Sequence, residues 1–265
     1  MNWFDTARPT WLHRANPTLK LIVFLVIFLY ILLIHNVNVM VNVTAVTLIL
    51  YAAFTGHSWR VLLLLLVPFV LLFLSSGTSM VFFGKGETTW VRWGPVHITA
   101  ESFLRGLHIG FKSISFALVG LVLALTTRPV QLFYSLMQQA RLPAKFAYSF
   151  MAAIRLLPMM AEELRTLRMA LKVRGADQAG GLRGMAVLMR RLTVPLLAQS
   201  IRRAQRMAVA MEAKRFSKSS KRTYYYKVGF SAADLVLVLY FLIALTAAHM
   251  AGLFFPYIDS LDVRL

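Results

Sequence analysis

The 265-residue chain contains no cysteine, and it has only 10 acidic residues against 29 lysines and arginines. The lack of cysteine excludes disulfides, thiolate metal sites, iron–sulfur clusters and cysteine nucleophiles. Charged residues of both signs are scarce, at 15% of the chain, whereas 58% of the residues are hydrophobic. This composition is too apolar for an ordinary soluble domain and predicts an integral membrane protein.

Motifs of membrane enzymes and metal sites are also lacking. The six histidines are widely separated, and no His-Glu-x-x-His or Gly-x-Ser-x-Gly segment occurs. The glycine-rich segment Gly175–Gly184 is predicted to be a loop, and no Gly-Lys-Ser/Thr follows it, so nucleotide binding is not expected there. We therefore expect no enzyme activity, no cofactor and no metal site, with a polytopic membrane enzyme kept as an alternative.

Five apolar runs approach the roughly 20 residues that a helix needs to cross a bilayer. They cover Leu19–Ile34, Val37–Phe54, Val61–Phe83, about Thr99–Thr126 and about Ala232–Phe255. Lys20 is expected to reach the membrane interface along its flexible stem. Thr99 is expected to cap the fourth run, and Ser231 with Asp234 has the spacing of a capping box before the fifth. The segment Gly84–His97 is predicted to be a polar loop with two tryptophans at the interface.

Polar and small residues inside two of the spans predict helix–helix contacts. Asn38 and Asn42 lie four residues apart, and we expect them to hydrogen-bond to a neighbouring helix rather than to a ligand. They are among the few polar residues within the spans, and the acidic residues of these runs, Glu101 and Asp234, lie at the beginning of a span. A permease that carries substrate itself needs polar groups that converge near the middle of the bilayer, and we keep it as the alternative function. In the fourth span, small residues form a stripe at Gly106, Gly110, Ser113, Ala117 and Gly120. The stripe allows another helix to approach closely, within the same subunit or in a partner membrane protein.

The positive charge is concentrated in one segment. Between Arg128 and Lys227 lie 20 of the 29 basic residues but 4 of the 10 acidic ones. The positive-inside rule places this segment and the N-terminus in the cytoplasm and the C-terminus outside. We therefore predict an all-α, multi-pass membrane protein with four spans in residues 1–126, a cytoplasmic part in 127–230 and a last span with an extracellular tail in 231–265.

Two long helices are predicted within the basic segment. From Ala144 to Val173 apolar residues recur at spacings of three, four or seven, which indicates an amphipathic helix about 45 Å long. A second helix is predicted from about Met185 to Phe216, and each ends in cations: Arg174 before Gly175, and Lys214 with Arg215. Such ends suit docking to carboxylates of a partner. A solvated basic surface near anionic lipid is the alternative.

Several short segments, taken in order, resemble the transmembrane T components of energy-coupling factor transporters. These are prokaryotic importers of vitamins and transition metals in the ATP-binding cassette class. The segment Leu12–Leu21 resembles the opening signature of the family. Its central pattern is matched by Thr126–Pro129, Leu142–Pro143, Ile154–Pro158, Pro195–Leu197, Arg202–Ala204 and Ala210–Ala213. Each piece is weak, but their order and spacing over Leu12–Phe216 are specific.

The resemblance implies a mechanism. In the family, two Ala-Arg-Gly-like motifs at the ends of coupling helices insert into grooves on two ATPase subunits. By position these motifs fall on Val173-Arg174-Gly175 and on Ala213-Lys214-Arg215. In the second motif, Lys stands at the usual Arg and Arg at the usual Gly, which leaves open whether Lys214 or Arg215 makes the contact. The chain would transmit ATP-driven motion to a separate substrate-binding S component.

The resemblance also implies the partners and the location. They are two ATPase subunits, an S component and the bilayer of a prokaryotic cell membrane, with no nucleic acid. The substrate would be a vitamin or related micronutrient, and the loop Gly84–His97 resembles that of dedicated systems for thiamine precursors, which makes thiamine or its precursor a candidate. A basic scaffold for lipid or nucleic acid is a further alternative, and co-purification with two ATPase chains would argue against it.

Overall fold

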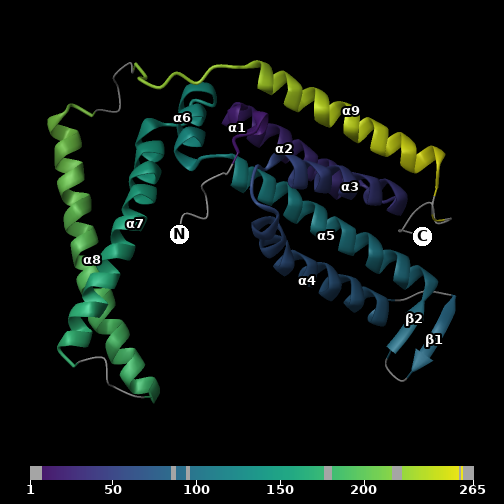
Figure 1. The fold of residues 1–265 in the computed structure, drawn as a ribbon, viewed down its shortest axis with the longest axis horizontal. Helices are drawn as coiled ribbons and strands as arrows, with labels where there is room; N and C mark the ends of the chain where they lie inside the picture. The colour runs from purple at the N-terminus through teal and green to yellow at the C-terminus, as the bar shows by residue number, and fades with distance from the viewer. Residues whose placement is uncertain are drawn as a thin grey trace. The chain divides into compact units, whose positions relative to one another are not determined.

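The computed structural model describes residues 8–84, 88–93, 96–175, 181–216, 223–256 and 258. Within these residues the regular structure is helical apart from one hairpin (Figure 1). The helices are α1 (Trp11–Arg14), α2 (Pro17–Leu33), α3 (Val37–Phe54), α4 (Trp59–Phe83), α5 (Ala100–Thr126), α6 (Pro129–Gln139), α7 (Ala144–Val173), α8 (Gly181–Ala213) and α9 (Ala232–Phe254). The predicted all-α membrane fold is therefore confirmed.

Four helices, α3, α4, α5 and α9, are long and apolar enough to cross a membrane. Helix α2 is apolar but has 17 residues, at the lower end of the roughly 17–25 residues that spans use. Together these five helices account for the five predicted spans. Helix α8 begins at Gly181, inside the predicted loop Gly175–Gly184, and residues 176–180 of that loop lie outside the described residues.

The chain divides into two compact units. The membrane unit consists of Met1–Leu136 and Val228–Leu265, and the inserted unit consists of Met137–Lys227. The first boundary falls inside α6, whereas the division based on the sequence begins the cytoplasmic part at residue 127. Helices α7 and α8 lie in the inserted unit, and the five apolar helices α2, α3, α4, α5 and α9 lie in the membrane unit.

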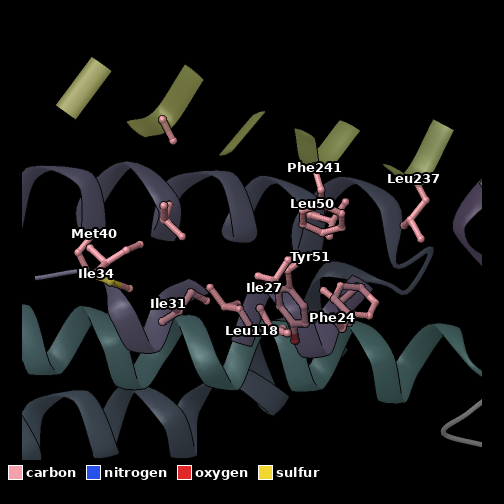
Figure 2. Close-up of a cluster of buried hydrophobic side chains, with 14 of the residues drawn as sticks. Phe24, Ile27, Ile31, Ile34, Met40, Leu50, Tyr51, Leu118, Leu237 and Phe241 are labelled. Atoms are coloured by element: carbon pink, nitrogen blue, oxygen red, sulfur yellow. The ribbon is translucent and has the colours of Figure 1, made fainter. Parts of the chain in front are cut away.

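The membrane unit is built around one cluster of buried side chains. In it, α5 packs against α2, α3 and α4, and α9 packs against α3 and α2. The cluster includes Phe24, Ile27, Ile31, Met40, Leu50, Leu118, Leu237 and Phe241 (Figure 2). Large apolar side chains on the outer faces of the same helices, such as Leu33, Leu71 and Leu242, are more than half exposed. An apolar exterior around an apolar core is expected for helices that face lipid.

The segment Gly84–His97, predicted as a loop, contains a hairpin instead. Strands β1 (Thr89–Trp93) and β2 (Val96–Thr99) pair antiparallel, with Arg92 opposite His97. The prediction was wrong because it weighed polarity above the β-branched and aromatic residues of this segment, which favour strands. Thr99 then caps α5 as predicted, since its hydroxyl accepts a hydrogen bond from Ser102 N–H at 3.1 Å.

Lys20 was expected to reach the membrane interface along its flexible stem, but its side chain is buried within the chain. It is 1% exposed, and its Nζ donates to the Thr126 carbonyl at 3.1 Å. The last carbonyls of a helix lack partners within the helix. The end of α5 therefore offers the ammonium group an acceptor inside the bundle.

Of the two asparagines of α3, Asn42 bonds to a neighbouring helix, as predicted, whereas Asn38 bonds to a residue after the end of α9. Asn42 Nδ2 donates to the Ala248 carbonyl on α9 at 3.2 Å. Asn38 Nδ2 donates to the Ile258 carbonyl at 3.0 Å, and Asn38 Oδ1 accepts from Ile258 N–H at 3.1 Å. Their amide groups therefore stabilise contacts between α3 and the C-terminal part of the chain.

In the inserted unit, α7 and α8 cross each other (Figure 1). Arg203 on α8 forms an ion pair with Glu163 on α7 at 3.2 Å. The ring of Tyr148, near the beginning of α7, lies 5.5 Å from that of Phe216, just after α8. The two helices therefore run antiparallel, and the end of α8 lies beside the beginning of α7.

Candidate functional site

Helix α7 ends in an exposed basic turn. Arg174 N–H donates to the Ala170 carbonyl at 3.2 Å, and Gly175 N–H donates to the Lys172 carbonyl at 3.0 Å. Gly175 has a φ of 66°, in the left-handed region that glycine adopts without steric cost. Arg174 and Gly175 are both exposed. The turn therefore presents a cation where the helix dipole favours positive charge.

Helix α8 ends in the same backbone conformation. Lys214 N–H donates to the Ala210 carbonyl at 3.2 Å, and Arg215 N–H donates to the Glu212 carbonyl at 2.9 Å. Arg215 has a φ of 55°. Lys214 therefore occupies the place that Arg174 has at the end of α7, and Arg215 occupies the place of Gly175. Lys214 and Arg215 are also exposed.

Arg215 is the unusual member of this pair of turns. A residue with a side chain pays about 1–2 kcal/mol for the left-handed conformation, which glycine adopts freely. The backbone of α8 thus ends as the glycine-containing turn of α7 does, although its sequence has an arginine there. Of the two cations at the end of α8, Lys214 is the one placed like Arg174.

The two basic ends lie far apart. The ring contact between Tyr148 and Phe216 places the end of α8 beside the beginning of α7. From Tyr148 to Arg174, α7 extends over about 40 Å at about 1.5 Å per residue. The two basic ends therefore suit two separate binding partners rather than one small partner.

Between these ends, both helices expose large apolar side chains. Those that are more than half exposed include Phe146, Phe150, Leu157 and Met169 on α7 and Met185, Val194, Leu197, Ile201 and Val209 on α8. Exposed apolar surface of this extent is typical of a protein or membrane interaction site. The inserted unit therefore combines cationic ends with an apolar middle.

The small-residue stripe of α5 divides into two parts. A Cβ added at Gly106 would lie 2.7 Å from the Gly77 carbonyl oxygen on α4, and one at Gly110 would lie 2.7 Å from the Phe73 ring. These two glycines therefore allow α4 and α5 to pack closely within the chain. Ser113 and Ala117 are half-buried, and Gly120 is exposed with no atom within 4 Å of an added Cβ. The last part of the stripe is thus accessible.

The described part of the chain contains no group of three or more His, Asp or Glu side chains placed to hold a metal ion. His13 Nδ1 accepts a hydrogen bond from Thr10 N–H at 3.2 Å. Burial, followed by the nearby charges of Lys20 and His57, lowers the pKa of His13 below its usual value. The surroundings of His13 therefore disfavour an additional positive charge.

A groove of about 510 Å³ lies between α2 and α9. Most of its lining is aliphatic or aromatic, and its polar residues are Tyr30, Thr246 and His249. Tyr30 Oη and His249 Nδ1 are hydrogen-bonded at 3.0 Å, and Thr246 Oγ1 donates to the Leu242 carbonyl at 2.6 Å. The groove therefore offers few free polar groups to a solute, and it does not favour a permease that carries substrate itself.

Comparison with known families identifies the family to which the chain belongs. Residues 8–225 match the family model described as CbiQ, cobalt transport protein. The chain belongs to the CbiQ family. The match begins before α1 and extends past both basic helix ends, so that it includes α1 to α8 and ends before α9.

Relatives of the chain agree with this assignment. The energy-coupling factor transporter transmembrane protein EcfT of Macrococcus caseolyticus is 26% identical over 239 residues, covering 87% of this chain and 89% of the relative. The EcfT protein of Brevibacillus brevis is 28% identical over 234 residues, covering 85% and 88%. That of Staphylococcus aureus is 26% identical over 240 residues, covering 86% and 87%. The resemblance to T components of energy-coupling factor transporters is therefore confirmed, and the chain is a multi-pass membrane protein of a transport family.

Proposed function

We propose that this chain is the transmembrane coupling subunit of an energy-coupling factor transporter. Two cytoplasmic ATPase subunits bind the ends of α7 and α8, and their ATP-driven motion passes to a membrane S component that holds the substrate. The observation that carries the proposal is the pair of exposed cationic turns with one backbone conformation, at opposite ends of the crossed helices. Membership in the CbiQ family supports it.

The two contacts differ in chemistry. At the end of α7, Arg174 is the docking cation and Gly175 provides the turn. At the end of α8, Lys214 is the docking cation, because it has the backbone position of Arg174, and Arg215 takes the place of the glycine. Lysine offers a single point charge where arginine offers a planar pair of donors, so the second contact should be the weaker one.

The S component would use the apolar surfaces. The exposed apolar side chains of α7 and α8 form one part of this interface, and the accessible end of the stripe, with Ser113, Ala117 and Gly120, forms the other. The charge distribution supports a cytoplasmic inserted unit and N-terminus and an external C-terminus. In this orientation the basic helix ends face the compartment that contains ATP.

The substrate of the assembled transporter is a vitamin or related micronutrient, with thiamine or its precursor as one candidate. The description of the family names cobalt for its members. Growth of a deletion strain on limiting thiamine, other vitamins or cobalt identifies the substrate. The nutrient whose requirement rises after deletion, and falls again on complementation, is the one transported.

The proposal is tested by reversing one charge. We expect Arg174→Glu to lower ATP-driven import by the reconstituted complex at least about tenfold, because a docking cation becomes an anion, and tenfold corresponds to about 1.4 kcal/mol of contact free energy. Arg165→Glu, an equal change at an exposed position within α7, is the control. Normal import by Arg174→Glu, or an equal loss in Arg165→Glu, would show that the end of α7 is not a docking site.

A further inference from the structure

The two connections between the inserted unit and the membrane unit are bonded to one residue. The chain leaves the membrane unit through α6 and returns to it at Val228. Asn16 Oδ1, at the start of α2, accepts a hydrogen bond from Ser135 Oγ on α6 at 2.9 Å. Asn16 Nδ2 donates to the Gly229 carbonyl at 3.2 Å, and Asn16 N–H donates to Asp234 Oδ1 at 2.5 Å. Asn16 therefore joins the beginnings of α2 and α9 to α6.

Local sequence explains why Asn16 is available for these bonds. It is the N-cap of α2, where its Oδ1 also accepts from Thr18 N–H at 3.0 Å, and Pro17 follows at the first helical position. Ser135 gives its one hydroxyl proton to Asn16, so the Thr18 hydroxyl is the donor in its 2.5 Å contact with Ser135. Asp234 uses its second oxygen to accept from Ser231 N–H at 2.6 Å, which caps α9.

We call Asn16, Thr18, Ser135, Gly229 and Asp234 the Asn16 joint. Its four members with polar side chains are at most 5% exposed. A buried polar group that loses its partner is costly, because neither water nor another group replaces the bond. A fully bonded cluster of this kind is rigid, so the joint should stay closed while the helices around it move.

A helix cap alone does not require these distant bonds. Asn36 caps α3 with the same local pattern, in which its Oδ1 accepts from Asn38 N–H at 2.9 Å and from Val39 N–H at 3.4 Å. Asn16 makes equivalent local bonds and in addition binds Ser135, 119 residues away, and Gly229, 213 residues away. The additional bonds connect the two ends of the insertion, and Asn36 offers a control for the loss of a cap.

We propose that Asn16 is a positioning residue for coupling, which holds both attachment points of the inserted unit against the beginning of α2. A displacement of α7 and α8 then moves α2, α6 and α9 together, because the two connections cannot move independently of each other. This inference rests on the coupling function proposed for α7 and α8. The existence of the joint itself can be tested without transport.

The first experiment measures the joint directly. The chain has no cysteine, so spin labels can be attached at Gln131→Cys on α6 and Phe230→Cys before α9, both exposed positions outside the joint. In the purified full chain, the distance distribution should be narrow and should broaden on Asn16→Ala but not on Asn36→Ala. A distribution that stays narrow in Asn16→Ala, or broadens equally in both variants, would overturn the joint.

The second experiment measures import and ATP hydrolysis by the assembled complex. Asn16→Ala should lower import per ATP by about tenfold or more, since several buried hydrogen bonds are lost, whereas Asn36→Ala should not. A broadened distance distribution in Asn16→Ala together with unchanged import per ATP would overturn the coupling role and leave the proposed function intact. If the wild-type complex showed no ATP-driven import, the proposed function would be refuted. The distances between the spin labels would still show whether the Asn16 joint exists.

A second pair of variants covers the case in which Asn16→Ala does not fold. Ser135→Ala removes the link to α6 and retains the cap of α2. Ser149→Ala is its control, because the Ser149 hydroxyl donates locally to the Lys145 carbonyl at 2.7 Å. A lower import per ATP in Ser135→Ala than in Ser149→Ala supports the coupling role, and equal values contradict it.

Discussion

The membrane unit and the inserted unit are both helical, but they place their apolar side chains differently. The membrane unit buries residues such as Phe24, Ile31 and Leu118 in one continuous cluster. In the described part of the inserted unit, the buried apolar side chains are Met137, Ala147, Met151 and Leu192. The membrane unit therefore carries its own core, whereas the inserted unit leaves many of its large apolar side chains exposed.

This difference has a consequence for stability. The crossing of α7 and α8 includes the ion pair of Arg203 and Glu163, and partly exposed ion pairs contribute only about 0–1 kcal/mol. Binding of partners to the folded form stabilises it by mass action. The arrangement of α7 and α8 should therefore depend on partners far more than the membrane unit does.

The largest effect is expected from a change in the packing of the membrane unit. A Cβ at Gly252 on α9 would lie 2.8 Å from the backbone nitrogen and Cα of Val39 on α3. We expect Gly252→Ala to lower the free energy of unfolding by about 1–3 kcal/mol, because the backbone of α3 must shift. Thermal unfolding in detergent measures this.

Gly120→Ala is the matched control for that change. Gly120 has no atom within 4 Å of an added Cβ, and alanine favours a helix over glycine by up to about 1 kcal/mol. Gly120→Ala should therefore be neutral or stabilising. Equal melting temperatures for the two variants would argue against close packing of α9 on α3.

A smaller effect sharpens the comparison of the two helix ends. Arg215→Gly should stabilise the end of α8 by up to about 1 kcal/mol, since glycine removes the left-handed strain but adds freedom to the unfolded chain. The affinity of the Arg215→Gly variant for an ATPase subunit should be unchanged or higher, whereas Lys214→Ala should lower this affinity. Titration of the ATPase against the purified chain measures both, and loss of binding in Arg215→Gly would identify Arg215 as the contact.

The smallest effect is expected at the crossing of α7 and α8. Glu163→Arg and Arg203→Glu should each destabilise the crossing by no more than about 1 kcal/mol, because the pair is partly exposed. The double charge exchange should restore it. Hydrogen exchange of α7 amides near Glu163 reports the change, and a double variant no better than the single ones would show that the pair does not hold the crossing.

Much of the secondary structure could be predicted from the sequence. The predicted limits of α7, Ala144 and Val173, are those of the structure, because its apolar spacing and the following glycine are local signals. Thr99 as the cap of α5, and Ser231 with Asp234 as the capping box of α9, follow from the sequence for the same reason. The hairpin of β1 and β2 does not follow from the polarity of its segment, and the strand preference of its β-branched and aromatic residues is the signal that indicates it.

The candidate site was predicted in part. The cations at the two helix ends follow from the sequence and from its resemblance to a family, and the segregation of charge follows from where the basic residues lie along the chain. The sequence does not show which cation at the end of α8 corresponds to Arg174, because the correspondence depends on the left-handed backbone of Arg215. Asn16 was missed as a connecting residue, although its position before Pro17 is a helix-cap signal.

By itself, the sequence determined the membrane class, the spans, the long basic helices and the caps, since each depends on composition or on residues within a few positions. The tertiary structure decided which partners distant polar groups take. Lys20 is bound by Thr126, and Asn16 by Ser135 and Gly229, across more than a hundred residues. Such pairs depend on how the helices pack, because a buried donor needs an acceptor close to it in space, and packing brings together residues that are distant in the sequence.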